Sequence, residues 1–438
     1  MKSFQIAVLA AFGSLVAALP SNISGRAVSS VVTGTPFGFA SAVTGGGTTA
    51  PVYPKTIADL KKYLTSTSPQ VIVISGTFDF AGSEGTEVHA ACNQYSCTPE
   101  NGGQSLLNTL GGCGTASTYS ATIDVAAYQG INVASDKTLV GLGTNTVLNG
   151  KGLRMAGVSN IIIQNIKITN LNPKYVWGGD AISLSNTNNI WIDHVTTSNL
   201  GRQHYSLGQA PNLAVTISNS YVDGKTSHSA TCDGHTYWGL ELVGTNDAIT
   251  FYSKSQFSTL SSLTTFGGPN FSSADMYQRF RVNKVLGISV TEIGSGVYLT
   301  VTNSHLENYV SYTSGRSPAL SGGTLFHAVN SVWASNSGHA IEGGTTKGGL
   351  FEGCSFVSVP TVLASGYTGS LLSATASNAA TCTANLGRPC VANAFTNSGA
   401  FTNSDSSFFS AFKGKNIPAA ASANSITSIV KNAGNTLA

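Results

Sequence analysis

A short strand-like segment recurs along the middle of this chain, and it restricts the possible folds more than any other feature. Residues 159–171 read SNIIIQNIKITNL, residues 188–200 read NNIWIDHVTTSNL, and residues 212–224 read NLAVTISNSYVDG. In each copy alternate residues are apolar and are followed by Asn or His, a pattern typical of a strand with one buried face. Similar segments continue to Asn330, mostly 25 to 29 residues apart. The repeat therefore predicts stacked coils of strands.

Stacked coils of this kind form a right-handed parallel β-helix, in which inward Ile and Val residues build a continuous core and Asn residues at one bend form a ladder. We expect this all-β fold, with long loops and with short helices that cap the open ends of the coil. Residues 56–66 (TIADLKKYLTS) and 425–435 (SITSIVKNAGN) have the apolar spacing of such helices. A β-sandwich is the alternative fold, but it would need hairpin turns at closer spacing.

The repeat is interrupted once. Residues 249–254 (ITFYSK) and 298–303 (YLTVTN) both resemble strands of the coil, but the residues between them show no clear period. We interpret the region of about 254–298 as an atypical insertion. It is either a long excursion from the coil or a segment that is not native to the fold.

Charged residues make up only 9% of the chain and its net charge is +3, which argues against a protein that binds nucleic acid. Residues 1–19 contain Lys2 and an apolar run before Pro20, and they predict a secretory signal peptide. Residues 20–26 are a candidate propeptide, and residues 27–438 are expected to form one β-helix domain. A membrane anchor is the alternative to a signal peptide, but no other stretch approaches 18 apolar residues. We therefore expect a secreted protein without a membrane partner.

Secretion makes the seven cysteines candidates for disulfide bonds, and an odd number leaves at least one outside any pair. Cys354 lies in the apolar run GLFEGCSFVSV and is the best candidate for a buried thiol. Glycosylation sequons stand at Asn22 and Asn270. Because the first is close to the predicted signal peptide, we expect glycosylation at Asn270.

Three polar stretches stand out against this weakly charged background. NPKYVWGGDAI contains Asp180, GRQHYSLG contains Arg202, and YTSGRSPAL contains Arg316. Each follows a strand of the predicted coil, so we expect all three to project from the same side, where loops build binding grooves. The carboxylates nearest to Arg316 in the sequence are Glu307 and Glu342. We therefore expect Arg316 to have no carboxylate partner in the protein and to face an anion that forms during a reaction.

Structural roles are the alternatives for these three residues. Asp180 would then end a Gly-Gly-Asp turn or form an ion pair with Arg202, and Arg316 would be solvated. Two arginines and an aspartate, without a carboxylate pair or a Ser-His-Asp set, suit an anionic substrate or an anionic intermediate.

The histidines do not predict a metal site. His194, His204 and His235 lack the spacing of metal ligands. We interpret His194 as part of the ladder at the bend and Asp193 as a structural residue.

The stretches NPKYVWGGDAI, WIDHVTTSNLGRQHY, SATCDGHTYWGLEL and TSGRSP occur in this order and resemble the motifs of secreted fungal pectin lyases of the pectate lyase superfamily. The resemblance extends from about Gly38 to the C-terminus, apart from the insertion. It implies a right-handed parallel β-helix and eliminative endo-cleavage of methyl-esterified α-1,4-polygalacturonan, the pectin of plant cell walls. The products would be 4,5-unsaturated oligogalacturonate methyl esters. A calcium-dependent pectate lyase and a non-catalytic wall-binding protein are the alternatives.

The resemblance also implies roles for the three polar residues. Arg316 would act at the C5 proton of the sugar, and Arg202 and Asp180 would complete the site. Removal of this proton develops an enolate charge on the ester carbonyl, which a fixed guanidinium stabilises. Because arginine has a pKa above about 12, Arg316 as the base would need a nearby cation and desolvation. The alternative, in which Arg316 only stabilises the enolate while water takes the proton, stays open.

Pectin polysaccharide is the implied partner, and we expect a monomer. Pectate lyases recruit Ca²⁺ through several carboxylates, whereas this sequence offers Asp180 and few others near the motifs. We therefore expect no cofactor and no metal, and activity that is independent of calcium. By the same resemblance the disulfides would be Cys92–Cys113, Cys97–Cys232 and Cys382–Cys390, with Cys354 outside them.

Binding of an esterified sugar chain should depend on stacking, because it offers apolar faces and little charge. The candidate aromatic platforms in or beside the motifs are Trp177, Trp238, Tyr205 and Tyr237. Trp191 and Trp333 lie in or beside predicted strands of the coil and are interpreted as core residues.

Overall fold

The computed structural model describes residues 27–253, 288–293, 296–301, 308–423 and 433–437. The predicted signal peptide and propeptide, the sequon at Asn270 and most of the expected C-terminal helix lie outside these residues. Within them, no helix is long and apolar enough to cross a membrane.

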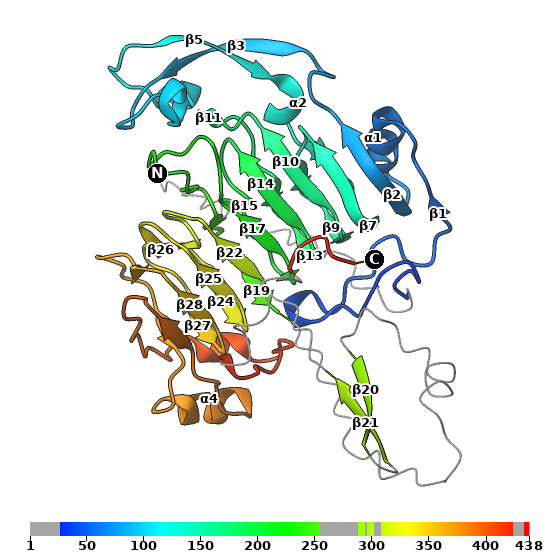
Figure 1. The fold of residues 1–438 in the computed structure, drawn as a ribbon, viewed down its shortest axis with the longest axis vertical. Coiled ribbons are helices and arrows are strands. Elements are labelled where there is room, and N and C mark those ends of the chain that lie inside the picture. Colours follow the sequence, from blue (N-terminus) through cyan, green and yellow to red (C-terminus); the bar gives the residue numbers. More distant parts are fainter. Residues whose placement is uncertain (1–26, 254–287, 294–295, 302–307, 424–432, 438) are drawn as a thin grey trace, which may run out of the picture.

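The coil expected from the repeat is present as a right-handed parallel β-helix (Figure 1). Ile190 pairs in parallel register with Ile161 of the preceding turn and with Val215 of the following turn, and all three are fully buried. The strands of successive turns form three rows. Two rows join in one 17-stranded sheet through the long strands β2 (Gln70–Asp79) and β7 (Lys137–Asn149), and the third row is an eight-stranded sheet.

The rows are named here in the order in which the chain passes through them. The first row contains β9 (Ser159–Gln164), β13 (Asn188–Asp193), β16 (Val215–Ser218), β19 (Ala248–Tyr252), β24 (Leu325–Val329), β27 (Gly348–Glu352) and β30 (Leu371–Ser373). The second row contains β10 (Lys167–Leu171), β14 (Thr196–Leu200), β17 (Tyr221–Asp223), β22 (Tyr309–Ser311), β25 (Val332–Ala334), β28 (Ser355–Val357) and β31 (Ala394–Thr396). The third row contains β6 (Ile131–Asn132), β8 (Leu153–Ala156), β12 (Ile182–Ser185), β15 (Tyr205–Leu207), β18 (Leu240–Leu242), β23 (Ala319–Leu320), β26 (His339–Gly343) and β29 (Thr361–Leu363).

Shorter elements cover the coil. The helix α1 (Ile57–Thr65), which the sequence predicts, packs against β2 and β6 with Leu60 and Leu64 buried. Among the described residues, the other α-helices are α2 (Val125–Tyr128) and α4 (Ala379–Leu386). Beside the 17-stranded sheet, into which β1 (Pro51–Val52) also pairs, a four-stranded sheet contains β3 (Thr86–Cys92), β4 (Ser105–Leu107), β5 (Tyr119–Asp124) and β11 (Tyr175–Val176).

The bend between the first and second rows explains the Asn or His that ends each repeat. Asn165, His194, Asn219 and Asn330 all have a positive φ, between 50° and 57°, which Asn tolerates better than most residues. Their side chains bond mainly to neighbouring turns: Asn165 Nδ2, for example, donates to the Gly141 carbonyl oxygen at 2.9 Å. The predicted bend is confirmed, although its bonds run mostly to backbone rather than from one Asn to the next.

A ladder of Asn side chains does exist at another place. Asn199 Nδ2 donates to Asn170 Oδ1, and Asn170 Nδ2 donates to Asn149 Oδ1, both at 2.6 Å. This ladder lies near the ends of the second-row strands, and we did not predict it. Asp193 and His194 form a buried structural contact, as interpreted, with 2.6 Å between Asp193 Oδ2 and His194 Nδ1.

The coil continues across the insertion. Residues 298–301, expected to be a strand of the coil, lie instead in β21 (Gly296–Val301), which pairs antiparallel with β20 (Ile288–Ile293). That expectation is wrong because a period of two fits either kind of strand. The last described residue of the coil before the insertion is Ser253, and the first after it is Asn308. The backbone N–H of Asn308 donates to Ser253 Oγ. The turns before Ser253 and after Asn308 pair with each other in register.

The three disulfides implied by the resemblance are confirmed: Cys92–Cys113, Cys97–Cys232 and Cys382–Cys390. Cys354 is outside them and is fully buried, as expected.

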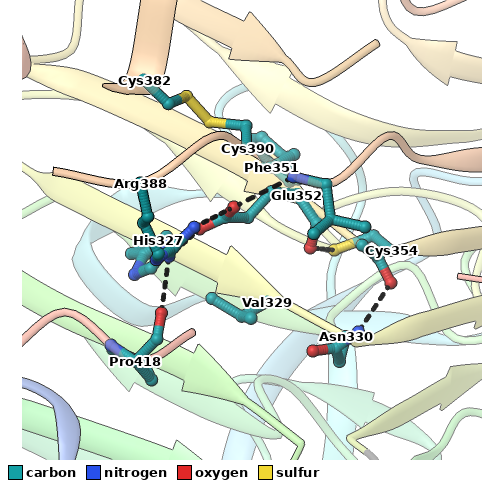
Figure 2. Close-up of polar contacts among 12 residues, drawn as sticks. His327, Val329, Asn330, Phe351, Glu352, Cys354, Cys382, Arg388, Cys390 and Pro418 are labelled. Atoms are coloured by element: carbon teal, nitrogen blue, oxygen red, sulfur yellow. Dashed lines mark hydrogen bonds and ion pairs between the residues drawn. A yellow bond between two sulfur atoms is a disulfide. The ribbon is translucent and has the colours of Figure 1, made fainter. Parts of the chain in front are cut away.

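A buried ion cluster holds the loop closed by Cys382 and Cys390 against the coil (Figure 2). Arg388 of this loop donates to both carboxylate oxygens of Glu352, from Nη2 at 2.6 Å and from Nη1 at 2.8 Å. His327 Nε2 lies 2.7 Å from Glu352 Oε1. Burial alone would raise the pKa of Glu352, but its bonds to Arg388 and His327 outweigh burial and lower the pKa to about 2. Glu352 is therefore kept charged by its two partners. The stabilisation of the folded state that this provides is lost only as pH falls from about 4.5 toward 2.

We predict that Arg388→Ala lowers the free energy of unfolding by about 3 kcal/mol, because Glu352 would stay buried with one cationic partner removed. Equilibrium unfolding in urea at neutral pH measures this change. Lys413→Ala, which removes an exposed cation from the same C-terminal region, is the matched control and should have little effect. A change below about 1 kcal/mol for Arg388→Ala, the size typical of an exposed pair, would contradict the assignment.

Candidate active site

The three polar stretches lie in equivalent turns, each between the second and third rows. Asp180 lies between β10 and β12, Arg202 between β14 and β15, and Arg316 between β22 and β23. The expectation that they project from the same side is confirmed. Arg316 follows β22, however, and not the strand predicted at 298–303.

Arg202 and Asp180 form a tight pair. Arg202 Nε lies 2.9 Å from Asp180 Oδ1, and Nη2 lies 2.6 Å from Oδ2. The guanidinium carbon lies 3.8 Å from the centre of the Trp177 ring, so the ring covers one face of the cation. Burial lowers the pKa of Arg202, but the bonds to Asp180 and the charge of Glu241 outweigh it and raise the pKa. Arg202 is therefore a fixed and permanently charged group, as the ion-pair alternative stated.

Glu241 links the two arginines, and the sequence analysis missed it. Its Oε1 accepts a hydrogen bond from Arg316 Nη1 at 3.0 Å, and its Oε2 lies 3.9 Å from Arg202 Nη1. Glu241 faces outward because it alternates in β18 with the buried residues Leu240 and Leu242. The outward position in the stretch LEL was the signal that could have identified it.

Arg316 also contacts a second carboxylate, so the expectation that it has none in the protein is wrong. Its Nε lies 3.3 Å from Glu342 Oε1. Glu342 lies one turn of the coil further along the chain, and its strand β26 pairs with β23. Glu342 is 26 residues and Glu241 is 75 residues from Arg316 in the sequence, so the residues next to Arg316 do not predict these contacts. The prediction that both guanidinium groups face only a substrate is therefore wrong.

Arg316 nevertheless keeps hydrogen-bond donors for a ligand. A guanidinium has five N–H groups, and the bonds to Glu241 and Glu342 use one on Nη1 and the one on Nε. Its Nη2 group makes no hydrogen bond to a carboxylate of the described residues, and the Tyr237 hydroxyl interacts with the guanidinium as well. The side chain is 29% exposed, compared with 12% for Arg202. Of the two arginines, Arg316 is the more accessible to solvent.

Glu342 is itself held in place. Its Oε2 accepts a hydrogen bond from Tyr237 Oη at 2.6 Å and contacts His339 Nε2. Burial would raise the pKa of Glu342, but these two bonds and the charges of His339 and Arg316 lower it. Arg316 is therefore anchored by a carboxylate that stays charged.

The aromatic residues divide into two groups. Trp177 covers Arg202, and the rings of Tyr237 and Trp238 lie edge to face with their centres 5.1 Å apart. The Arg316 guanidinium carbon is 5.1 Å from the Trp238 ring centre, and all three aromatic residues are partly exposed. They remain candidate sugar platforms.

Tyr205 is fully buried in the core, so its prediction as a platform is wrong. In the stretch YSL the first and third residues point inward and only Ser206 faces out. Trp191 and Trp333 are buried core residues, as interpreted.

The comparisons with known proteins agree on one family. A sequence-family profile described as Pectate lyase matches residues 100–236. The chain is 59% identical to probable pectin lyase E of Aspergillus niger, over 94% of this chain and 97% of that protein. It is 40% identical to pectin lyase A of Emericella nidulans, over 97% of this chain and 99% of that protein. The chain belongs to the pectin lyase family.

A solved structure shows the same fold. Pectate lyase from Paenibacillus sp. 0602 is 12% identical and has a TM-score of 0.50, over 92% of this chain and 96% of that chain. At this identity the likeness concerns the fold alone. The pectin lyases that are 59% and 40% identical to this chain confirm that its four motifs resemble those of fungal pectin lyases.

A cavity of about 440 Å³ lies beside the catalytic candidates of this pectin lyase family member. Trp177, Asp180 and Arg202 line it together with Arg154 and Tyr128, whereas Arg316 does not. In the described part of the chain, no group of three or more His, Cys, Asp and Glu residues is arranged to hold a metal ion.

We predict that Glu241→Gln lowers kcat by about 10- to 100-fold with KM nearly unchanged, because Arg316 would lose the charged anchor that fixes its position. Initial rates on esterified pectin measure both constants. Glu87→Gln removes an exposed carboxylate from β3 and serves as the control. An unchanged kcat for Glu241→Gln would show that Arg316 does not need this anchor.

Proposed function

We propose that this protein is a secreted, monomeric pectin lyase that cleaves methyl-esterified α-1,4-polygalacturonan by β-elimination within the chain. The products are 4,5-unsaturated oligogalacturonate methyl esters, and the setting is plant cell-wall degradation. The names of the relatives, the three disulfides and the partly exposed aromatic residues support this proposal. The observation that carries it is the guanidinium of Arg316, which is 29% exposed and fixed between two carboxylates beside Tyr237 and Trp238.

In this reaction the proton on C5 leaves, and its electron pair forms an enolate with the ester carbonyl. The enolate then collapses to a C4–C5 double bond, and the C4 oxygen departs and takes up a proton. Arg316 donates from Nη2 to the carbonyl oxygen as negative charge develops there. Donors that are already positioned stabilise such charge without a cost of reorganisation at the moment of reaction.

The ion pairs favour one of the two roles considered for Arg316. A base must give up its own proton first, yet Glu241 and Glu342 both lie within ion-pair distance of this guanidinium and stabilise its charge. We assign Arg316 to stabilisation of the enolate, with water as the acceptor of the C5 proton. Arg202 and Asp180 then position the site through Glu241 and Trp177.

Independence from calcium is part of this proposal. Asp180 accepts from Arg202 with both oxygens, and Glu241 and Glu342 each accept from Arg316. Carboxylates that bind arginine in this way are not available as a set of calcium ligands without breaking the pairs. An esterified substrate also brings no carboxylate that needs a metal bridge.

One prediction from the proposed function concerns the reaction and its metal requirement. Purified protein should release products with a C4–C5 double bond from highly esterified pectin, at the same rate with EDTA as with added Ca²⁺. Ultraviolet absorbance of the unsaturated products measures the rate. Loss of activity with EDTA would favour a calcium-dependent pectate lyase. Binding to pectin without any unsaturated product would favour a non-catalytic wall-binding protein.

Another prediction from the proposed function concerns Arg316 itself. Arg316→Lys should lower kcat by about 10²- to 10³-fold and change KM little, because lysine keeps the charge but loses the planar set of donors. Thermal unfolding of the variant checks that the fold is intact. Activity close to that of the wild type would exclude Arg316 from the chemical step.

A further inference from the structure

A row of outward-facing residues leads from the catalytic arginines along the third row of strands. Arg154 pairs in register with Ser183, Ser183 pairs with Ser206, and Ser206 pairs with Glu241. Neighbouring parallel strands are about 4.8 Å apart, so three steps place Arg154 about 14 Å from Glu241 along the axis. A sugar chain that lies along this row at Arg316 would therefore extend past Arg154.

Arg154 differs from the other arginines of the described chain. Arg202, Arg316 and Arg388 each have a carboxylate within ion-pair distance. No carboxylate of the described residues lies within that distance of Arg154. Its Nη1 donates to Asn132 Oδ1 at 2.9 Å, and the residue is exposed. The side chain is thus oriented by a neutral partner while its charge stays without a counter-charge.

Arg154 lines the cavity beside Arg202. Arg154, Asp180 and Arg202 are the charged residues that line it. Because both oxygens of Asp180 are bound to Arg202, the positive charge of Arg154 is the excess charge of the cavity. Trp177 and Tyr128 also line the cavity and offer the flat apolar surfaces on which sugar rings stack.

We propose that this cavity is a sugar subsite in which Arg154 binds the carboxylate of a non-esterified galacturonate unit. The proposal rests on the proposed function and deepens it. The sugar at Arg316 carries a methyl ester, whereas the sugar at Arg154, about 14 Å along the row from the Glu241 that binds Arg316, is preferred as the free acid. The enzyme would then act best on partly esterified pectin in which a free acid stands at this distance from an ester.

The planar guanidinium suits this role. It forms two parallel hydrogen bonds to a carboxylate, and such bonds are stronger and more directional than those to a neutral ester. An ester carbonyl in the same place offers one acceptor without charge. The discrimination should therefore depend on the charge of Arg154 and on its fork of donors.

Kinetics of Arg154→Gln on two substrates test the proposal: fully methyl-esterified polygalacturonan and the same polymer partly de-esterified. The variant should raise KM for the partly esterified polymer by about tenfold, with kcat unchanged, because one charge-assisted contact is lost. On the fully esterified polymer both constants should stay within about twofold. Arg154→Lys, which keeps the charge, should recover part of the loss.

The matched control is Lys413→Gln, which removes one exposed cation that does not line the cavity, and it should leave the ratio of the two KM values unchanged. If Arg154→Gln changes both substrates equally, or neither, the subsite assignment is wrong. If the wild-type protein forms no unsaturated product even from the fully esterified polymer, the proposed function fails first. The two failures are therefore distinguishable.

Discussion

The constant register between turns of the coil is the constraint on which both the core and the site depend. Each turn adds one strand to each row, so residues about 25 positions apart become direct neighbours. Inward positions then stack into a continuous core, as Ile161, Ile190 and Val215 do. Outward positions of the third row stack in the same way and bring Glu241 beside the turns that carry Arg202 and Arg316. One geometric rule therefore builds the apolar interior and the charged surface site.

Much of the coil could be predicted because its determinants are local. Alternation within a few residues marks the strands, and the residue after them must adopt a positive φ, which explains Asn165 and His194. Residues 298–301 show the limit of this reasoning, because alternation does not say which strand a segment pairs with. The return of the chain at Asn308 depends on contacts with Ser253 and with neighbouring turns, which no local pattern shows.

The site was predictable in position and less so in chemistry. Equivalent turns placed Asp180, Arg202 and Arg316 on one side, as the spacing indicated. The ion pairs of Arg316 were not predictable from neighbouring residues, because its partners lie one turn away on either side, with the insertion between Glu241 and Arg316. The alternation of buried and exposed residues, applied to the stretches YSL and LEL, would have predicted that Tyr205 faces inward and Glu241 faces outward. The register between turns thus determines which residues of the separate motifs contact one another.

The central claim is that Arg316, held by Glu241 and Glu342, directs its remaining donors at the carbonyl oxygen of a sugar ester. A crystal structure of the wild-type protein with a methyl-esterified oligogalacturonate product tests it most directly. The account predicts an ester carbonyl oxygen about 3 Å from Arg316 Nη2, with both carboxylate contacts retained. A sugar chain bound along the coil with no ester oxygen near Arg316, or with Arg316 turned away from it, would contradict the account.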